Sequence, residues 1–248
     1  MLCYKKGFLR VVEFWFDEMD VCPSTDIVRY FQRTSPLEGG TCVPFHTLVT
    51  DLQQETDALF AKIKKDTRYE IRRGAEKDRL TYCGSNSVDA ETLSRFLNFY
   101  RRFAGANRVA PPNSIRLQLL AKIGALYLSE ALNADGRSLV RHAYCRFDNR
   151  RARLLYSASE LHDAANKSLI GRANRYLHWN DFLALQALGT KLYDFGGWYE
   201  GTQDAKKIRI NQFKEEFGGQ VVVNFNSHQG ATWRGKVALW AYQKLVHG

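Results

Sequence analysis

Two clusters of basic residues give the first chemical signal in this 248-residue sequence. Arg68, Arg72 and Arg73 fall in one predicted helix, which places Arg68 and Arg72 on the same face. Guanidinium groups four residues apart repel each other unless an anion lies between them. Arginine forks match phosphate oxygens in two-point contacts, so the cluster predicts a site for the diphosphate of a substrate. A solvated helix face is the alternative.

The second basic cluster directly precedes a helix that we expect to begin at Arg175. Its polar and small residues are Lys167, Ser168, Gly171, Arg172 and Asn174. Backbone N–H groups and the dipole at a helix start attract anions, and two cations beside them are typical of a pyrophosphate site. A solvated loop with an ordinary helix cap is the alternative.

Five residues are candidate proton acceptors for a reaction at such a site: His142, Glu160, His162, Asp163 and Asp194. Histidine ordinarily titrates near neutral pH, which suits a general base. A loop histidine can equally well meet only solvent. Asp194 ends a predicted strand beside two glycines, so it serves either as a base or as the cap of that turn.

Composition narrows the classes of function. The net charge of +10 and the pI of about 9.4 favour anionic partners, which include phosphate-bearing molecules, nucleic acid and an anionic membrane surface. No run of about 18 apolar residues predicts a membrane span, and the N-terminal residues do not resemble a secretory signal. The five cysteines are widely spaced and form no CxxC pair, which predicts reduced thiols and a cytoplasmic location. The histidines form no HxxxH pair, so we expect no metal site.

The elements that must position these residues follow from hydrophobic periodicity and turn residues. In the first half we expect strands at 8–16, 27–33 and 45–52, a helix at 53–73, a linker at 82–90, and helices at 91–104 and 114–123. An antiparallel meander follows, with strands at 125–132, 139–147 and 152–159. We then expect a loop to residue 174, a helix at 175–188, a strand at 191–195, a helix at 208–217, a strand at 220–225 and a C-terminal helix.

This order of elements from residue 91 onward is that of the GNAT acyltransferase fold, an α/β fold with a mixed sheet. The segments HWNDFLALQALGTKLYDFGG and IRINQFKEEFGG resemble the Fem-type aminoacyltransferases of that superfamily and their small relatives. TLVTDL and TRYEIRR are similar to the N-terminal half of that group, so the resemblance covers about residues 45–226. We expect an N-terminal lobe at 1–88 on the acceptor side, for which a degenerate GNAT half is an open alternative, and an acyltransferase core at 89–248.

The resemblance implies an acyl donor, acyl-CoA, in a V-shaped gap between two strands, with its phosphates at the helix start after the meander. The family motif there usually reads Gln/Arg-x-x-Gly-x-Gly/Ala. This chain has Ser168-Leu169-Ile170-Gly171-Arg172-Ala173, which departs at the first position. Lys214 corresponds to the family lysine thought to steady charge on the carbonyl. His162 and Asp163 would lie near that carbonyl, and Tyr193 would donate a proton to the leaving thiolate.

Among the small relatives are N-acyltransferases that acylate an amino group on a nucleotide-linked sugar for surface polysaccharide, and this is the function we expect. Trp198 and Tyr199 would stack on the base or sugar of that acceptor, unless they are core residues. No stable nucleic-acid complex is expected, and the sequence leaves the oligomeric state, including a homodimer, open. The alternatives are a Fem-type transferase that uses aminoacyl-tRNA, and a non-enzymatic module that binds nucleic acid or an anionic surface.

Overall fold

The computed structural model describes residues 1–18, 24–38, 41–148, 150–160 and 167–247. The chain forms two compact units: unit 1 consists of Met1–Thr47 and Val221–Gly248, and unit 2 of Leu48–Gln220. These units differ from the division expected at residue 88. Residues 65–85 pack within unit 2, because a helix and a strand from that segment lie against later elements of the same unit.

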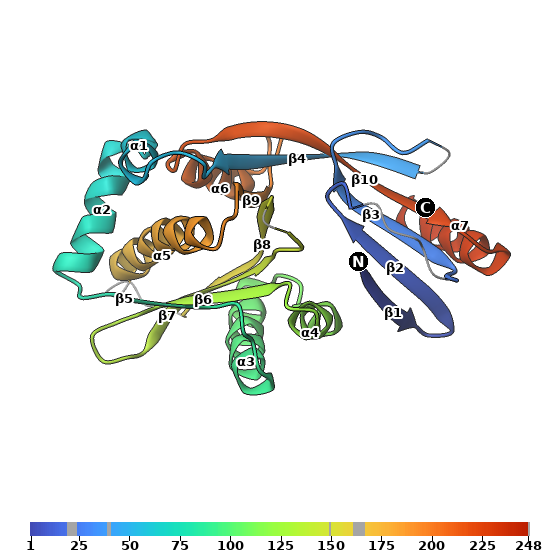
Figure 1. The fold of residues 1–248 in the computed structure, drawn as a ribbon, viewed down its shortest axis with the longest axis horizontal. Coiled ribbons are helices and arrows are strands. Elements are labelled where there is room, and N and C mark those ends of the chain that lie inside the picture. Colours follow the sequence, from blue (N-terminus) through green and yellow to red (C-terminus); the bar gives the residue numbers. More distant parts are fainter. Residues whose placement is uncertain (19–23, 39–40, 149, 161–166, 248) are drawn as a thin grey trace. The chain divides into compact units, whose positions relative to one another are not determined.

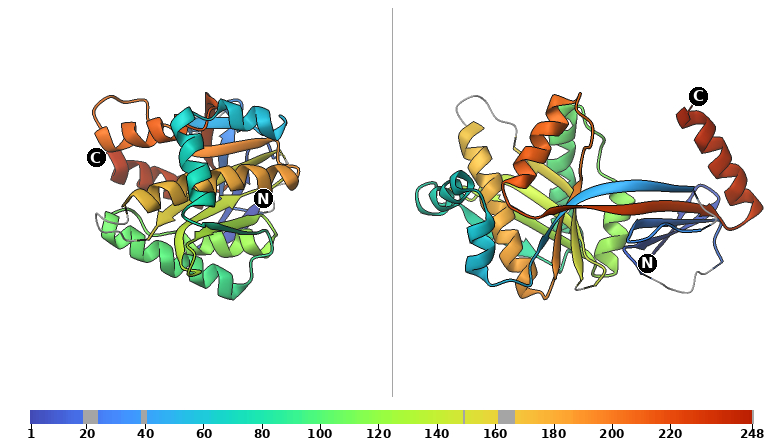
Figure 2. Two further views of the ribbon diagram at one scale, coloured as in Figure 1. Left: turned by 90° about the vertical axis from the view of Figure 1, so that its left-hand side faces the viewer. Right: turned by 90° about the horizontal axis from the view of Figure 1, so that it is seen from above.

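Unit 1 is a small sheet with one helix. Its elements are β1 (Leu2–Lys6), β2 (Leu9–Trp15), β3 (Ile27–Arg33), the first part of β4 (Thr41–Asp51), β10 (Gln220–Gly230) and α7 (Trp233–His247), and residues 48–51 of β4 belong to unit 2. The strand order is β1-β2-β3-β10-β4, and β2 and β3 are parallel whereas β1–β2 and β3–β10 are antiparallel. The long strands β4 and β10 lie side by side (Figure 2).

Unit 2 contains the meander and most of the helices. Its first elements are α1 (Thr56–Lys62), α2 (Lys65–Glu76), β5 (Thr81–Ser85), α3 (Ala90–Asn107) and α4 (Ser114–Lys122). They are followed by β6 (Leu126–Leu132), β7 (Ser138–Cys145), β8 (Arg151–Ser159), α5 (Lys167–Ala187), β9 (Leu192–Gly197) and α6 (Ala205–Glu215). From the end of β4, the strand order is β9-β8-β7-β6-β5. The meander β6-β7-β8 is antiparallel, as expected, and β8 pairs with β9 in parallel.

Helices cover both faces of the curled sheet in unit 2 (Figure 1). Helix α5 lies on one face with α2 beside it, and α3 and α4 lie on the other face. The main core fills the space around α5 and β9, where Phe182, Tyr193 and Phe217 are fully buried. The functional candidates on α5 and β9 therefore lie beside fully buried core residues.

The expected loop up to residue 174 is wrong for its described part, because α5 already begins at Lys167. Ile170, Ala173 and Leu177 are buried together in a second core cluster with Leu80 and Leu139, among others. Their spacing of three and four is that of a helix face, and it continues the apolar face of the expected helix by two turns.

Other boundaries also differ from those expected. The expected linker at 82–90 contains β5, which forms an antiparallel pair with β6. The expected helix at 53–73 is two helices, because Ile63 adopts an extended conformation (φ −70°, ψ 138°). Helix α3 passes Gly105 and ends at Asn107, and its C-cap residue, Arg108, adopts the left-handed conformation.

The predicted start of α3 is confirmed. The side chain of Asp89 accepts a hydrogen bond from the backbone N–H of Thr92, which is the N-cap arrangement. Asn113 caps α4 in the same way through Arg116 N. None of the helices in the described residues is long and apolar enough to cross a bilayer.

Candidate active site

Strands β8 and β9 separate after a short parallel pairing. Their register ends at Arg153 opposite Asp194. Gly196, with φ +75°, still approaches the carbonyl of Leu154, and a Cβ at Gly196 would lie 3.0 Å from that oxygen. Beyond this point the two strands no longer pair. They leave the V-shaped gap that the resemblance implied.

Gly196→Ala is expected to lower the free energy of unfolding by about 1–2 kcal/mol, because a left-handed backbone costs an L-residue roughly that amount. The control is Gly105→Ala in α3, where a Cβ meets nothing within 4 Å. That change should raise the free energy of unfolding by about 0.5–1 kcal/mol. Urea unfolding followed by circular dichroism measures both. If both substitutions changed the free energy of unfolding equally, the left-handed conformation of Gly196 would not be the cause.

A cavity of about 430 Å³ lies at this gap. Its lining comes from α3, β8, α5, β9 and α6, and consists of Phe103, Leu154, Ser157, Asn174, His178, Phe195, Lys206, Arg209, Ile210, Phe213 and Lys214. Apolar side chains form about half of the lining, and the charged groups in it are three cations without a carboxylate. Such a lining suits an apolar acyl chain joined to an anionic carrier.

Lys214 is a buried cation in the wall of the cavity. Its side chain comes from α6, and its Nζ donates hydrogen bonds to the carbonyl oxygens of Gly196, at 3.3 Å, and Gly197. Burial lowers the pKa of Lys214 to about 8; Arg153 adds to this shift, and the charge of Asp194 opposes it. Two of its three protons are held by the glycine carbonyls. The third can serve a molecule in the cavity.

His178 lies on α5 in the same wall, and only 2% of its surface is exposed. Its ring packs against Phe195 and Phe217, with centroids 5.1 Å away in both cases. Burial holds the pKa of His178 well below its usual value, and the positive charge of Lys214 is among the further causes. The ring is therefore neutral at physiological pH.

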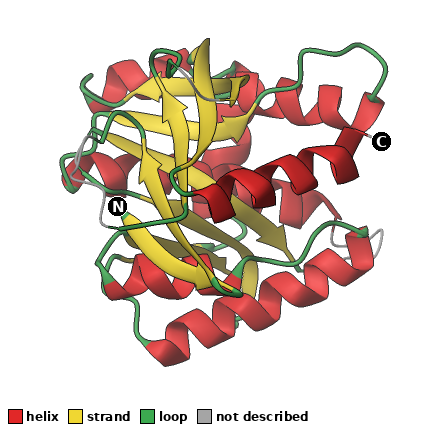
Figure 3. Cartoon of the chain, turned by 90° about the vertical axis from the view of Figure 1, so that its right-hand side faces the viewer, coloured by secondary structure: helices red, strands yellow, loops and turns green. Residues whose placement is uncertain are grey.

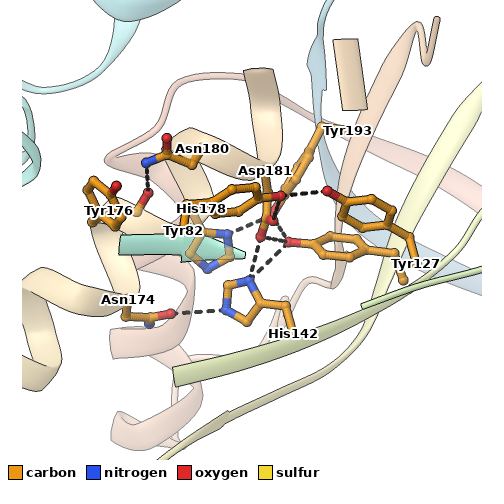
Figure 4. A network of polar contacts seen from close by, with 10 residues as sticks. Tyr82, Tyr127, His142, Asn174, Tyr176, His178, Asn180, Asp181 and Tyr193 are labelled. Carbon is orange, nitrogen blue, oxygen red and sulfur yellow. Dashed lines mark hydrogen bonds and ion pairs between the residues drawn. The ribbon is translucent and has the colours of Figure 1, made fainter. Parts of the chain in front are cut away.

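A chain of buried hydroxyl groups connects His178 to Asp181 (Figure 4). His178 Nδ1 lies 2.6 Å from the Tyr193 hydroxyl, and that hydroxyl lies 2.6 Å from the hydroxyl of Tyr144. The Tyr144 hydroxyl donates to Asp181 Oδ2 at 2.5 Å. Burial, reinforced by the charge of Asp181, raises the pKa values of Tyr144 and Tyr193 well above 10, so both keep their protons.

The direction of these hydrogen bonds fixes the tautomer of His178. Each hydroxyl has one proton, and Tyr144 gives its proton to Asp181. Tyr144 must then accept from Tyr193, and Tyr193 must accept from His178 Nδ1–H. The neutral ring consequently carries its lone pair on Nε2, which has no hydrogen-bond partner within the described part of the chain. This nitrogen can accept a proton from a molecule in the cavity.

Asp181 and His142 complete the buried network. Asp181 is fully buried and also accepts from Tyr82, at 2.9 Å, and from His142 Nδ1, at 2.8 Å. The other ring nitrogen of His142 lies 3.1 Å from the side-chain oxygen of Asn174. Asn174 also lines the cavity, so its side chain joins the buried network to the cavity.

Asp194 and Tyr193 lie behind the cavity wall rather than in it. Asp194 is fully buried; it pairs with Arg151 (Nη2–Oδ2, 2.7 Å) and accepts a hydrogen bond from Gly196 N at 2.8 Å. These contacts correspond to the turn-capping alternative for Asp194. The hydroxyl of Tyr193 is used by Tyr144 and His178, so Tyr193 is placed to orient His178 and not to reach a thiolate.

The predicted pyrophosphate segment lies in the first two turns of α5 instead of in a loop. Arg172 forms a two-point ion pair with Asp78, and Ala173 is fully buried. Gly171 is a helical residue, whereas Lys167 and Ser168 are exposed at the start of the helix. Of this group, only Asn174 lines the cavity.

The three arginines of α2 lie away from the cavity lining. Arg68 donates to the carbonyl of Ala61 at 2.7 Å, and the Arg72 guanidinium stacks over the Phe60 ring at 5.1 Å. Arg73 donates to the hydroxyl of Tyr69. The cluster is thus a partly exposed helix face, and a diphosphate site there stays a prediction.

The remaining candidates fall outside the cavity or outside the described residues. Trp198 packs against the main core, and Tyr199 lies under Lys207, whose Nζ is 4.9 Å from the ring centroid. Glu160 pairs with Arg137 at 3.5 Å. His162 and Asp163 lie outside the described residues.

The sequence analysis missed His178 and Asp181 as functional candidates. Both lie on the apolar face of α5, with Phe182 and Leu185. Two ionisable residues within the apolar stripe of a helix predict a buried polar network, and this was the available signal. Among the described residues, no group of three or more His, Cys, Asp or Glu side chains could hold a metal ion.

No protein-family model matches this sequence, and no curated protein matches it. Solved structures do resemble the fold. FemX superimposes with a TM-score of 0.60 at 13% identity, and the match covers 73% of this chain and 61% of FemX, which is less than two thirds of that protein.

Two further structures match more of the chain. The C-terminal domain of a lysylphosphatidylglycerol synthetase from Agrobacterium fabrum has a TM-score of 0.57 at 11% identity, with 88% of this chain and 72% of that chain covered. L-PGS from Bacillus licheniformis also has a TM-score of 0.57 at 11% identity, and the match covers 97% of this chain and 84% of L-PGS. At these identities the likeness shows a shared fold. It confirms the predicted α/β fold class with a mixed sheet, and the resemblance to FemX holds for the fold alone.

Proposed function

We propose that this chain, which has the fold of FemX, transfers an acyl group from acyl-CoA to an amine in the cavity between β8 and β9. The observation that carries the proposal is the cavity lining: a buried cation and a neutral histidine face an apolar space whose rim is basic. Lys206 and Arg209 are exposed, so they are available for the phosphates of the donor.

The chemistry follows from these groups. The amine nitrogen attacks the thioester carbonyl, the C–N bond forms, and negative charge develops on the carbonyl oxygen. The ammonium of Lys214 stabilises this charge. His178 Nε2 takes the proton from the attacking nitrogen, and the C–S bond then breaks to release the coenzyme A thiolate.

A nucleotide-linked amino sugar remains the acceptor that we propose. The anionic diphosphate of such an acceptor suits the net charge of +10 and the exposed arginines of α2. Release of free thiol from acyl-CoA, measured with and without this acceptor, tests the transfer directly.

The donor can be tested by thermal unfolding. Coenzyme A at a hundred times its dissociation constant is expected to stabilise the protein by about 2.7 kcal/mol. Pantetheine, which lacks the phosphates, is the control and should stabilise far less, because it cannot contact Lys206 and Arg209. No shift with any coenzyme A ester at millimolar concentration would contradict the proposed donor.

Aminoacyl-tRNA is the second candidate donor, and the FemX-like fold favours it. The cavity lining opposes it, because it offers no carboxylate for the α-ammonium group of an aminoacyl ester. Retention of charged tRNA, with an affinity that falls steeply as salt rises, would select this candidate.

The pH dependence of kcat provides a further prediction. Lys214, with a pKa of about 8, is protonated below that pH and loses its charge above it. If its ammonium stabilises the oxyanion, kcat falls as pH rises through about 8. In Lys214→Arg the guanidinium stays charged, so the fall should disappear. An unchanged alkaline fall in Lys214→Arg would exclude Lys214 as its cause.

A further inference from the structure

Helix α7 in unit 1 carries a stripe of exposed apolar side chains. Trp233, Val237 and Trp240 are 71%, 56% and 57% exposed. Their spacing of four and then three residues places all three on one face of the helix. Large aromatic side chains exposed in a row are uncommon on a surface that meets only water.

The contacts of α7 with the sheet fix the direction of this stripe. Thr232 donates to Asp26 Oδ1 at 2.7 Å and accepts from Gly235 N at 3.3 Å, which anchors the start of the helix. Gly235 is buried against the Asp26 carbonyl, and Leu239 lines a cavity together with β3 and β10 residues. Gly235 and Leu239 form the side of α7 that faces the strands, so the Trp233 stripe faces away from them. Figure 3 shows the C-terminal helix lying along the strands.

Cations flank the stripe. The guanidinium of Arg234 lies 5.6 Å from the Trp233 ring centroid, and Nζ of Lys244 lies 4.3 Å from that of Trp240. Lys236 is also exposed. Residues 231–248 contain no Asp or Glu. An apolar stripe with tryptophans and basic flanks is the composition of a helix that lies in a membrane interface.

We propose that α7 docks this protein on the surface of an anionic lipid bilayer. The indoles of Trp233 and Trp240 enter the boundary between headgroups and acyl chains, and the flanking cations contact the lipid phosphates. A second copy of the chain fits this face less well. A two-fold contact between two stripes would place Arg234, Lys236 and Lys244 opposite cations, with no carboxylate in the segment to pair with them.

Vesicle co-sedimentation tests the proposal. The full chain should bind vesicles of phosphatidylcholine with one third phosphatidylglycerol, and bind vesicles of phosphatidylcholine alone at least tenfold more weakly. Trp233→Ser/Trp240→Ser and Arg234→Glu/Lys244→Glu should each lower the partition coefficient about tenfold or more. A blue shift of tryptophan fluorescence with vesicles should vanish in the double tryptophan variant.

Two matched control variants change exposed residues of unit 2. Ile115→Ser/Ile123→Ser removes two exposed apolar side chains, and Lys77→Glu/Lys122→Glu reverses two exposed charges. Both should bind the anionic vesicles within twofold of the parent chain. An equal loss in these controls, equal binding to neutral vesicles, or no binding would overturn the proposal. A dimer that sedimentation velocity detects for the parent chain but not for the double tryptophan variant would also overturn the proposal.

Discussion

Replacing Lys214 by methionine is expected to lower kcat for acyl transfer by about 10²–10³-fold, with the KM for the donor changed by only a few-fold. The Lys214 ammonium lies in the wall of the cavity, where two glycine carbonyls hold it in place. It meets the charge of the carbonyl oxygen only in the transition state, so its loss lowers kcat more than binding. Steady-state thiol release from acyl-CoA measures both constants.

The control for this variant is Lys207→Met on the same helix. Lys207 is exposed, lies over the ring of Tyr199 and is not part of the cavity lining. Its removal should leave kcat within twofold. A drop in kcat/KM for Lys214→Met that came only from KM would show that Lys214 binds the donor and does not act on the reacting carbonyl.

The sequence predicted those parts of the fold that depend on residues close together in the chain. The turn residues between the meander strands, the apolar spacing of α3 and its cap at Asp89 each act within a few residues. By contrast, β5 contains Cys83 and Gly84, and its ladder with β6 decides its conformation. The first two turns of α5, which precede the expected start at Arg175, likewise depend on the packing of Ile170 and Ala173 against distant residues, among them Leu80.

The same distinction separates the parts of the candidate site. Lys214 could be identified because a short motif marks it, and the structure places it in the cavity wall. The network around Asp181 could not be identified in this way. Its hydroxyls come from Tyr82, Tyr127, Tyr144 and Tyr193 on four strands, and only the register of the sheet brings them together. No spacing along the chain records that register.

His178→Gln is expected to lower kcat by about 10²–10⁴-fold, because glutamine keeps much of the volume but offers no basic nitrogen to the cavity. Tyr193→Phe should have a smaller effect, about tenfold. It removes the oxygen that accepts the Nδ1 proton of His178, so the ring is no longer held in the tautomer with a free Nε2. Steady-state kinetics on both variants at pH 7 give the comparison, and thermal unfolding verifies that each variant is folded.

Chemical rescue distinguishes a base from a packing residue. His178 packs against three phenylalanine rings, so its loss also affects the core, and an activity loss alone would be ambiguous. In His178→Gly, added imidazole can enter the space next to the 430 Å³ cavity and accept the proton, so it should restore activity at least tenfold. The rate should follow the concentration of neutral imidazole as pH is varied. A folded His178→Gln variant with kcat within threefold of the parent chain, or a His178→Gly variant that imidazole does not rescue, would leave water as the proton acceptor and assign His178 a packing role.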